Sequence, residues 1–368
     1  MKITVVYVVN KLRNSGPVRV MLDIIKYLDK SRFIPVIVTL MEEDQSRSIK
    51  KTFEGMGVQI ISYKYNFWQL EFQPSKIAKC IELECSSFEN VIYHAHSYQA
   101  NIILANMSSK QTVATIHCIS GEDFVINYGS IQGRYMSLRY RKNLNNIRYP
   151  VAISEYMADY YKDVALHLKV ITNGVDFMPD KVEDPKIYKR ELGCENRFVI
   201  LVSGAFSKRK NQQLIIQELK KLPIDFLCIF IGKGDLLEKC KVLAEGDGRF
   251  IFKGYVFNVK DYIKAADIVI SASLSEGMPL AVLEAINMGC PVLLSSIPPH
   301  NEIYRRMSGL GAFVFDYLKE GSLSKAIEEI ISLPINRMDV SNAACAIYSA
   351  RRMSEGYQEL YSRIDKEI

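Results

Sequence analysis

A polar turn at 275–279 joins two apolar segments and carries side chains suited to a polar ligand. The apolar run 267–273 before the turn predicts a buried strand, and the apolar residues 280–288 after it predict a helix. Two carboxylates, Glu276 and Glu284, stand eight positions apart, one in the turn and one about a turn into the helix. Both can therefore face one crevice at the carboxyl end of a strand, where α/β proteins bind ligands.

The start of the predicted helix is suited to an anion. The backbone amides of Leu280 and Ala281 lie in its first turn, where N–H groups have no acceptor within the helix and the helix dipole favours negative charge. Pro279 fits this position because its missing N–H would have had no partner in any case. Gly277 and Met278 complete the turn between Glu276 and the helix. We therefore expect an anion to bind beside the two carboxylates.

A second candidate anion site follows the apolar strand predicted at 198–203. Gly204 opens the loop, and Lys208, Arg209 and Lys210 are consecutive just before a predicted helix. One interpretation is a solvated helix N-terminus, but cations oppose the helix dipole at that end. We favour phosphate binding by this loop.

Two further glycine loops are weaker candidates. The polar loop at 10–16 follows the first strand and contains Gly16, so its backbone amides could approach a phosphate closely. A single Gly-Pro turn is common, and alone it would favour a purely structural role. Gly232 and Gly234 lack the third glycine of a dinucleotide fingerprint, since position 237 is Leu, and predict a turn passing close to a nucleotide base.

The histidines fall near predicted strand ends. His117 ends the apolar run 112–117, at the edge of the sheet that binds ligands, and we favour a functional role for it over a satisfied core position. His94 and His96 share one strand face, so a metal pair is conceivable. No carboxylate or third histidine stands at ligand spacing, however, and we favour a structural or acceptor-binding role.

Metal-binding patterns are missing from the sequence. Its eight cysteines include no Cys-x-x-Cys pair and are expected to be reduced core residues. No Asp-x-Asp occurs, which removes the usual carboxylate pair for a divalent ion on a nucleotide diphosphate. A bound diphosphate would therefore be neutralised by lysine and helix N-termini, and we expect no metal and no other cofactor.

These loops are positioned by strands that alternate with helices along all 368 residues. This alternation predicts two doubly wound α/β domains with a crevice between the carboxyl ends of their strands. The predicted strands lie near 3–9, 34–40, 58–62, 91–95, 112–117 and 151–153, then near 198–203, 226–231, 249–252, 267–272, 291–295 and 312–315.

Domain boundaries follow from the turn Asn173-Gly174 and the polar stretch 179–197. We predict a first domain at 1–174 and a second domain at 175–350. The spacing of apolar residues over 338–368 predicts a terminal helix.

The net charge is +6, and its excess is concentrated in one acid-free stretch between Asp123 and Glu155. One interpretation is a solvated face. The other is a patch for an anionic surface, either lipid headgroups or a phosphate-bearing acceptor, with Phe67 and Trp68 nearby in a Tyr-rich loop. No nucleic-acid-binding module is present. No apolar run is long enough to span a membrane and the N-terminus has no cleavage site, so we expect a cytoplasmic protein, peripheral at the inner face of the cell membrane. The basic residues of this stretch are Arg134, Arg139, Arg141, Lys142 and Arg148.

Four motifs in this order resemble the retaining glycosyltransferases of family four, over essentially the whole chain. The most specific is Glu-x7-Glu, from Glu276 to Glu284 with its flanking residues. The segment Ile-Thr-Asn-Gly-Val-Asp is similar to the family's Ile-Pro-Asn-Gly-Val-Asp, and the loop from Gly204 to Asn211 resembles its G-R-x-x-x-x-K-N. Tyr-His-Ala-His-Ser followed by Thr-Ile-His117 is similar to the acceptor-domain pattern.

The resemblance implies the two-domain GT-B fold, with an acceptor-binding domain at 1–174, a donor-binding domain at 175–350 and a final helix at 351–368 that returns to the first domain. It also implies a metal-independent, retaining hexosyl or N-acetylhexosaminyl transfer. The donor would be a nucleotide-diphosphate sugar, with a UDP-sugar favoured, and the acceptor a saccharide or lipid-linked glycan of a capsule, O-antigen or other surface polysaccharide. The implied roles are as follows: Glu276, Gly277 and Met278 at the donor sugar, Glu284 at the ribose, Lys210, Leu280, Ala281 and Gly16 at the diphosphate, His117 with Glu276 at the reaction centre, and Arg209 and Gly204 as auxiliary residues.

One departure from the family pattern keeps other functions open. Ala205 stands where the family has an arginine, which removes a charge-assisted contact worth about 1.5–3 kcal/mol unless Lys208 or Arg209 replaces it. Without a replacement, the chain would bind its donor weakly or act as a non-catalytic scaffold subunit of a glycosylation complex. An inverting transferase or epimerase on the same fold is a third hypothesis, against which the Glu-x7-Glu motif argues.

Overall fold

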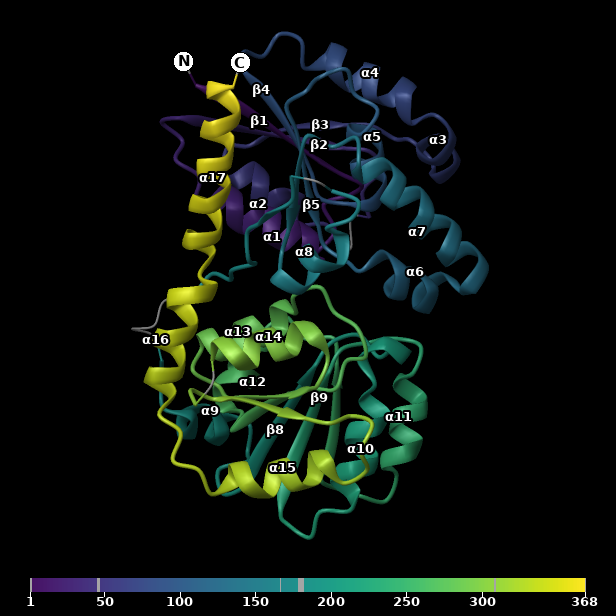
Figure 1. Cartoon of the computed structure of the whole chain (residues 1–368). Coiled ribbons are helices and arrows are strands. Elements are labelled where there is room, and N and C mark those ends of the chain that lie inside the picture. The colour runs from purple at the N-terminus through teal and green to yellow at the C-terminus, as the bar shows by residue number, and fades with distance from the viewer. Residues whose placement is uncertain (1, 45–46, 166, 178–181, 308, 368) are drawn as a thin grey trace. The chain divides into compact units, whose positions relative to one another are not determined.

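The computed structural model describes residues 2–44, 47–165, 167–177, 182–307 and 309–367. The chain forms two compact units (Figure 1), which we call the first and second domains. The first comprises Met1–Gly174 together with Ala350–Ile368, and the second comprises Val175–Ser349.

The first domain contains a parallel sheet with the strand order β3-β2-β1-β4-β5-β6-β7. The predicted apolar runs form these strands, because a parallel sheet covered on both faces buries every side chain of its central strands. In β1 all seven residues are buried. The strands are β1 Ile3–Val9, β2 Phe33–Thr39, β3 Gln59–Ser62, β4 Val91–Ala95, β5 Thr112–Ile116, β6 Tyr149–Ala152 and β7 Lys169–Val170.

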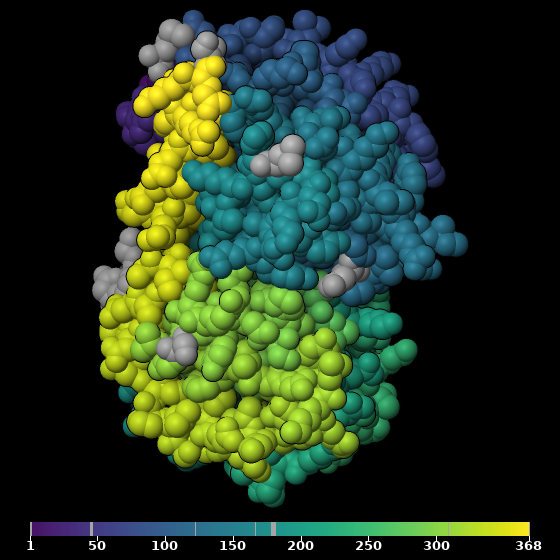
Figure 2. Space-filling view, in the orientation of Figure 1, coloured from purple at the N-terminus to yellow at the C-terminus, as the bar shows by residue number. Residues whose placement is uncertain are grey.

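Helices connect these strands, and a helix from the far end of the sequence joins them. In that helix, α17, the stripe predicted from the sequence is buried, including Tyr357 and Tyr361. Its Ser354 hydroxyl donates to the Ile24 carbonyl of α1 at 2.8 Å, and Figure 2 shows its yellow atoms lying against the first domain. The helices are α1 Gly16–Lys26, α2 Lys50–Gly55, α3 Phe67–Phe72, α4 Pro74–Glu84, α5 Tyr98–Leu104, α6 Ser120–Tyr128, α7 Ser130–Leu144, α8 Glu155–Tyr161 and α17 Ala350–Lys366.

The second domain repeats this design with a parallel sheet in the order β10-β9-β8-β11-β12-β13. Its strands are β8 Phe198–Ser203, β9 Phe226–Ile231, β10 Phe250–Gly254, β11 Ile268–Ser271, β12 Val292–Ser295 and β13 Ala312–Phe315. Its helices are α9 Pro185–Glu191, α10 Gln212–Lys220, α11 Leu237–Ala244, α12 Val259–Ala265, α13 Leu280–Asn287, α14 Pro298–Arg306, α15 Ser322–Ile331 and α16 Arg337–Tyr348, with a 3-10 turn, η2, at Lys208–Lys210.

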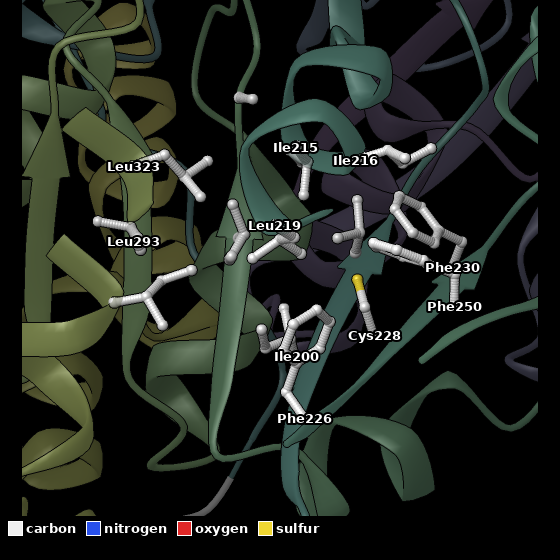
Figure 3. Packing of buried hydrophobic residues seen from close by; sticks show 14 of the residues in the cluster. Ile200, Ile215, Ile216, Leu219, Phe226, Cys228, Phe230, Phe250, Leu293 and Leu323 are labelled. Carbon is white, nitrogen blue, oxygen red and sulfur yellow. The ribbon is translucent and has the colours of Figure 1, made fainter. Parts of the chain in front are cut away.

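An apolar core between the sheet and its helices holds the second domain together. Ile215, Ile216 and Leu219 of α10 pack against side chains of β8 and β9, including Ile200 and Phe230 (Figure 3). All five of these side chains are fully buried. Burial of such side chains stabilises a fold by about 1.5–3 kcal/mol each, which keeps the strand ends of this sheet in fixed positions.

One prediction about the helices is wrong. The segment 338–368 is not one helix, because the chain is extended at Ser349, where it forms a β-bridge with Val175. The polar stretch 179–197 contains a helix, α9, that the sequence did not predict. Asp184 caps that helix by accepting a hydrogen bond from the Lys186 amide at 3.0 Å, and residues 178–181 lie outside the described ranges.

All eight cysteines are free thiols, and five of them are buried. None of the helices in the described ranges is long and apolar enough to cross a membrane.

Candidate active site

Loops from two neighbouring strands meet at the centre of the second sheet. The strands β8 and β11 are adjacent, and the chain continues from β8 toward β9 on one side and from β11 toward β12 on the other. Such a switch point leaves an opening at the carboxyl ends of the two strands. The loop after β8 carries Lys210 and the loop after β11 carries Glu276, and the Leu274 amide donates to the Arg209 carbonyl across them at 2.8 Å.

A charge cluster links these loops through side chains. Lys210 Nζ lies 2.5 Å from Oε1 of Glu276, and Arg209 lies 2.7 Å from its Oε2. Arg209 also donates to the Ser275 carbonyl at 2.8 Å. Glu276 is only 7% exposed, and burial by itself would raise its pKa. The charges of Lys210 and Arg209 outweigh burial and lower the pKa to about 2, so the carboxylate stays ionised.

Glycines allow the loop after β8 to approach the loop after β9. A Cβ atom on Gly232 would lie 1.9 Å from the carbonyl oxygen of Gly204, and one on Gly234 would lie 2.3 Å from that of Phe206. Gly204 itself lies against the Lys210 side chain, with its Cβ position 3.5 Å from Lys210 Cε. The two glycines at 232 and 234 therefore serve the packing of the cation loop, in addition to the turn predicted from the sequence.

The helix α13 begins directly after the turn that carries Glu276. Gly277 and Met278 are buried, whereas Leu280, Ala281 and Glu284 are only partly buried. The spacing of the last three residues places them on one face of the helix. This face of α13, which carries Glu284 and begins at the first-turn amides, is therefore partly exposed on the second domain.

His300 is a residue near this cluster that our sequence analysis missed. It is fully buried in α14, and its Nδ1–H donates to the Ser295 carbonyl at 3.0 Å. Burial lowers its pKa to about 4, and the Glu276 charge opposes that shift. The ring is therefore neutral. The only sequence signal was its place shortly after a buried strand, at the same edge of the sheet.

The remaining predicted site residues belong to the first domain, whose switch point lies between β1 and β4. The loop after β1 leads to Gly16, which is exposed at the start of α1. Asn10 from this loop donates to Gln99 at 2.6 Å and accepts from Ser97 at 2.8 Å, both of which follow β4. The side chains after the two strands are therefore held together, as at the centre of the second sheet.

Three histidines lie beside this switch point. His96 Nδ1 is 3.1 Å from His117 Nε2, and the ring of His94 lies against that of His96 in a tilted arrangement, with centroids 4.1 Å apart. Both nitrogens of His94 are occupied, Nδ1 by the Tyr361 hydroxyl at 2.7 Å and Nε2 by the Thr115 hydroxyl at 2.8 Å. His94 is thus a structural residue that connects β4 to α17. Within the described ranges, groups of three or more His, Cys, Asp or Glu placed to hold a metal ion do not occur.

Comparisons with known proteins agree with this architecture. Residues 14–177 match the family model of Glycosyltransferase Family 4, and residues 184–346 match that of Glycosyl transferases group 1. The O-antigen biosynthesis glycosyltransferase WclY of Escherichia coli is 24% identical over 99% of both chains. A UDP-Gal:alpha-D-GlcNAc-diphosphoundecaprenol alpha-1,3-galactosyltransferase of Escherichia coli is 30% identical over 43% of both chains.

Solved structures share the fold over the whole length. Alr3699/HepE of Anabaena, in complex with UDP and glucose, has a TM-score of 0.77 at 16% identity, covering 98% of this chain and 100% of its own. Sucrose-phosphate synthase of Thermosynechococcus elongatus has a TM-score of 0.82 at 14% identity over 100% of both chains. Family models over both domains, a full-length relative and these folds together show that the chain is a glycosyltransferase of the GT-B fold, with Family 4 sequence in its first domain and group 1 sequence in its second.

Proposed function

We propose that this glycosyltransferase transfers a hexose or N-acetylhexosamine from a UDP-sugar to a saccharide or lipid-linked acceptor in the synthesis of O-antigen or another surface polysaccharide. The observation that carries the proposal is the cluster of Lys210, Arg209 and Glu276 beside the first turn of α13. The names of the Escherichia coli relatives support the class of product, and UDP in the HepE complex supports the class of donor.

The donor's diphosphate binds to the cations and helix amides of the second domain. Lys210 and the amides of Leu280 and Ala281 contact it, and Gly16 adds a backbone amide from the first domain. Arg209 supplies the second cation that Ala205 cannot, because its guanidinium already reaches the Glu276 turn. Each such charge-assisted contact contributes about 1.5–3 kcal/mol. Gly204 lies against the Lys210 side chain.

The sugar and ribose bind to the carboxylates of the same segment. Glu276, with Gly277 and Met278, accepts hydrogen bonds from the donor sugar's hydroxyl groups, and Glu284 accepts them from the ribose. An ionised carboxylate is the right partner for a hydroxyl donor, and the pKa of Glu276, lowered to about 2, keeps it ionised throughout the physiological range. His117 contacts the sugar from the first domain.

The transfer retains the anomeric configuration and needs no metal. The bond between the anomeric carbon and the diphosphate oxygen breaks, and the acceptor oxygen forms its new bond on the same face of the sugar. The acceptor's proton passes to a phosphate oxygen of the departing UDP. Negative charge grows on that diphosphate, where Lys210, Arg209 and the α13 amides are already in position to stabilise it.

Product analysis tests this proposal. Purified enzyme is incubated with individual UDP-sugars and acceptors in the presence of EDTA, UDP release is followed, and the product's anomeric configuration is assigned by NMR. We expect UDP release that persists in EDTA and an axial product from an axial donor. An inverted product would contradict retention, loss of activity in EDTA would contradict metal independence, and binding of no nucleotide sugar would favour the scaffold hypothesis.

We also propose that the first domain contacts an anionic lipid surface at the inner face of the cell membrane, which places the protein in the cytoplasm. The helix α7 buries Met136, Tyr140 and Leu144 but leaves Ile131 and Leu138, at 87% and 71% exposure, on its outer side. Such an outward apolar stripe with cations beside it is typical of helices that lie in a membrane interface.

Charge complementarity selects anionic lipid as the partner of this surface. Arg134 and Lys142 are exposed on α7, in the stretch that contains no acidic residue. An ion pair between Arg139 and Glu71 joins α7 to α3, whose exposed Trp68 and Phe72 rings stack on each other. Aromatic rings of this kind favour the headgroup level of a bilayer, and each cation near an anionic membrane adds about 1 kcal/mol.

A further inference from the structure

His96 is a fully buried imidazole whose neighbours determine how it can be protonated. Its Nδ1 lies 3.1 Å from Nε2 of His117, and its Nε2 has no hydrogen-bond partner among the described residues. Burial lowers the pKa of both rings below the ordinary value, so both are neutral. One neutral ring must therefore donate and the other accept across the 3.1 Å contact.

Two arrangements of the protons satisfy that contact. In the first, His96 donates from Nδ1–H to Nε2 of His117, and the unpartnered Nε2 of His96 carries only a lone pair. In the second, His117 donates from Nε2–H, and His96 must carry an N–H on its buried Nε2. A buried N–H without an acceptor is rarer in proteins than an acceptor with an unused lone pair. Burial thus favours the first arrangement over the intrinsic preference of free imidazole for Nε2–H.

The first arrangement determines what His117 offers to a ligand. Its Nε2 accepts from His96, so its single proton must be on Nδ1. None of the described residues hydrogen bonds to that atom, and His117 is partly exposed at the carboxyl end of β5. The atom is therefore available to a ligand as a hydrogen-bond donor.

The ring of His96 is held in place by a second histidine. His94 lies against it with ring centroids 4.1 Å apart and is itself fixed by hydroxyl groups of Tyr361 and Thr115. Tyr357 donates to or accepts from the same Thr115 hydroxyl at 2.8 Å. Two tyrosines of α17 thus restrain the cluster of His94, His96 and His117.

We propose that His96 is a positioning residue that keeps the proton of neutral His117 on Nδ1, so that His117 donates a hydrogen bond to an oxygen atom of the bound sugar. That the oxygen atom belongs to a sugar rests on the proposed function, whereas the position of the proton on His117 does not.

Nitrogen-15 NMR of the histidine-labelled, full-length protein tests the proton's position directly. The two nitrogens of a neutral imidazole have distinct chemical shifts according to which one carries the proton. We expect a protonated Nδ1 and a bare Nε2 in His117, and the same in His96. A protonated Nε2 in His117 would overturn the proposal and would leave the proposed transferase function intact.

Substitutions test the functional consequence. His96→Asn keeps an N–H donor near the position of Nδ1, whereas His96→Leu has none. We expect His96→Asn to stay within about fivefold of the wild-type kcat and His96→Leu to lose about 10–100-fold in kcat with a smaller change in KM, as expected for an interaction that strengthens in the transition state. Equal losses in both variants would contradict the donor role. If the NMR result holds but His117→Ala transfers sugar normally, the assigned contact between His117 and the sugar is wrong, and this part of the proposal falls with it.

Discussion

Lys210 Nζ lies 2.5 Å from Glu276 Oε1, although 66 positions separate the two residues in the sequence. The contact is possible because each residue sits just beyond one of two adjacent strands. The contact also means that the Glu276 carboxylate partly neutralises the charge of Lys210 before a donor binds. A diphosphate that binds here must share Lys210 with the Glu276 carboxylate. Arg209 also pairs with that carboxylate, so its positive charge offsets the repulsion between the carboxylate and the diphosphate.

Lys210→Ala should weaken binding of UDP by about 10–100-fold, since it removes one charge-assisted contact to the diphosphate. The matched control is Lys208→Ala, in the same 3-10 turn, because Lys208 is exposed. Isothermal titration calorimetry with UDP checks both variants. Equal losses in the two variants would show that the loop acts only through its total charge.

Glu276→Gln should abolish sugar transfer while the protein remains folded. The substitution keeps the shape of the side chain but leaves Lys210 and Arg209 without their counter-ion. Because both cations retain some contact with solvent, we expect a loss of only about 1–3 kcal/mol in the free energy of unfolding. Urea denaturation and UDP-release assays measure the two effects, and near-normal turnover would refute the role of Glu276 at the donor sugar.

Acid should destabilise the first domain at a higher pH than is usual. Burial lowers the pKa of His94, His96 and His117. In the unfolded chain these rings become protonated near pH 6.5, whereas in the folded protein they stay neutral to a lower pH. Below pH 6.5 the unfolded state therefore binds more protons than the folded state. The free energy of unfolding should therefore fall below pH 6.5, by up to about 4 kcal/mol per pH unit for three rings.

Urea denaturation at pH 7, 6 and 5, followed by the fluorescence of the single tryptophan, Trp68 in the first domain, measures this slope. Glu276 acts in the same direction but at a lower pH, because its pKa is depressed to about 2. It should subtract stability only between about pH 4.5 and pH 2. A stability that is flat from pH 7 to pH 5 would contradict the neutral, buried state of the three histidines.

Gly232→Ala should destabilise the second domain and reduce its affinity for UDP. The added Cβ would meet the Gly204 carbonyl oxygen, and the backbone at Gly232 has a φ of +140°. Strain of this kind costs about 1–3 kcal/mol. Gly248→Ala is the control, since nothing lies within 4 Å of its Cβ position. Denaturation and UDP titration should separate the two variants, and identical behaviour would show that the loop can move away without cost.

Ile131→Ser combined with Leu138→Ser should reduce sedimentation with vesicles that contain phosphatidylglycerol, because both side chains are exposed on α7. Val242→Ser, at an equally exposed position of the second domain, should not. Vesicles of phosphatidylcholine alone should bind weakly, and removal of Arg134 and Lys142 should reduce binding to the vesicles that contain phosphatidylglycerol. If the wild-type protein ignores both kinds of vesicle but binds a free phosphate-bearing acceptor, the basic stretch serves the acceptor instead.

The strands could be predicted from the sequence because parallel strands are buried on both faces and appear as unbroken apolar runs. The same reasoning brought the loops with Lys210 and Glu276 to one edge of a sheet. It could not supply the ion pair itself, nor the turn of Arg209 toward Glu276, because those depend on side-chain directions that spacing does not encode.

Contacts between distant residues are what sequence reasoning missed. His94 is predicted to have a structural or acceptor-binding role, but its contact with Tyr361 spans 267 positions and no spacing in the sequence predicts it. His300 lies in a loop-to-helix segment with no glycine pattern. The break at Ser349 follows from a backbone pairing with Val175, since the sequence there contains no proline or glycine.

The helix α17 also imposes an order on synthesis. Its tyrosines complete the interior of the first domain, yet they are translated after every residue of the second domain. Domains generally fold in the order in which they leave the ribosome. In this chain the first domain cannot complete its core until α17 has been synthesised, so the second domain can fold before it. While residues 175–349 are translated, the cluster of His94, His96 and His117 lacks the tyrosines of α17. The nascent first domain is therefore incomplete during that time and is a target for chaperones.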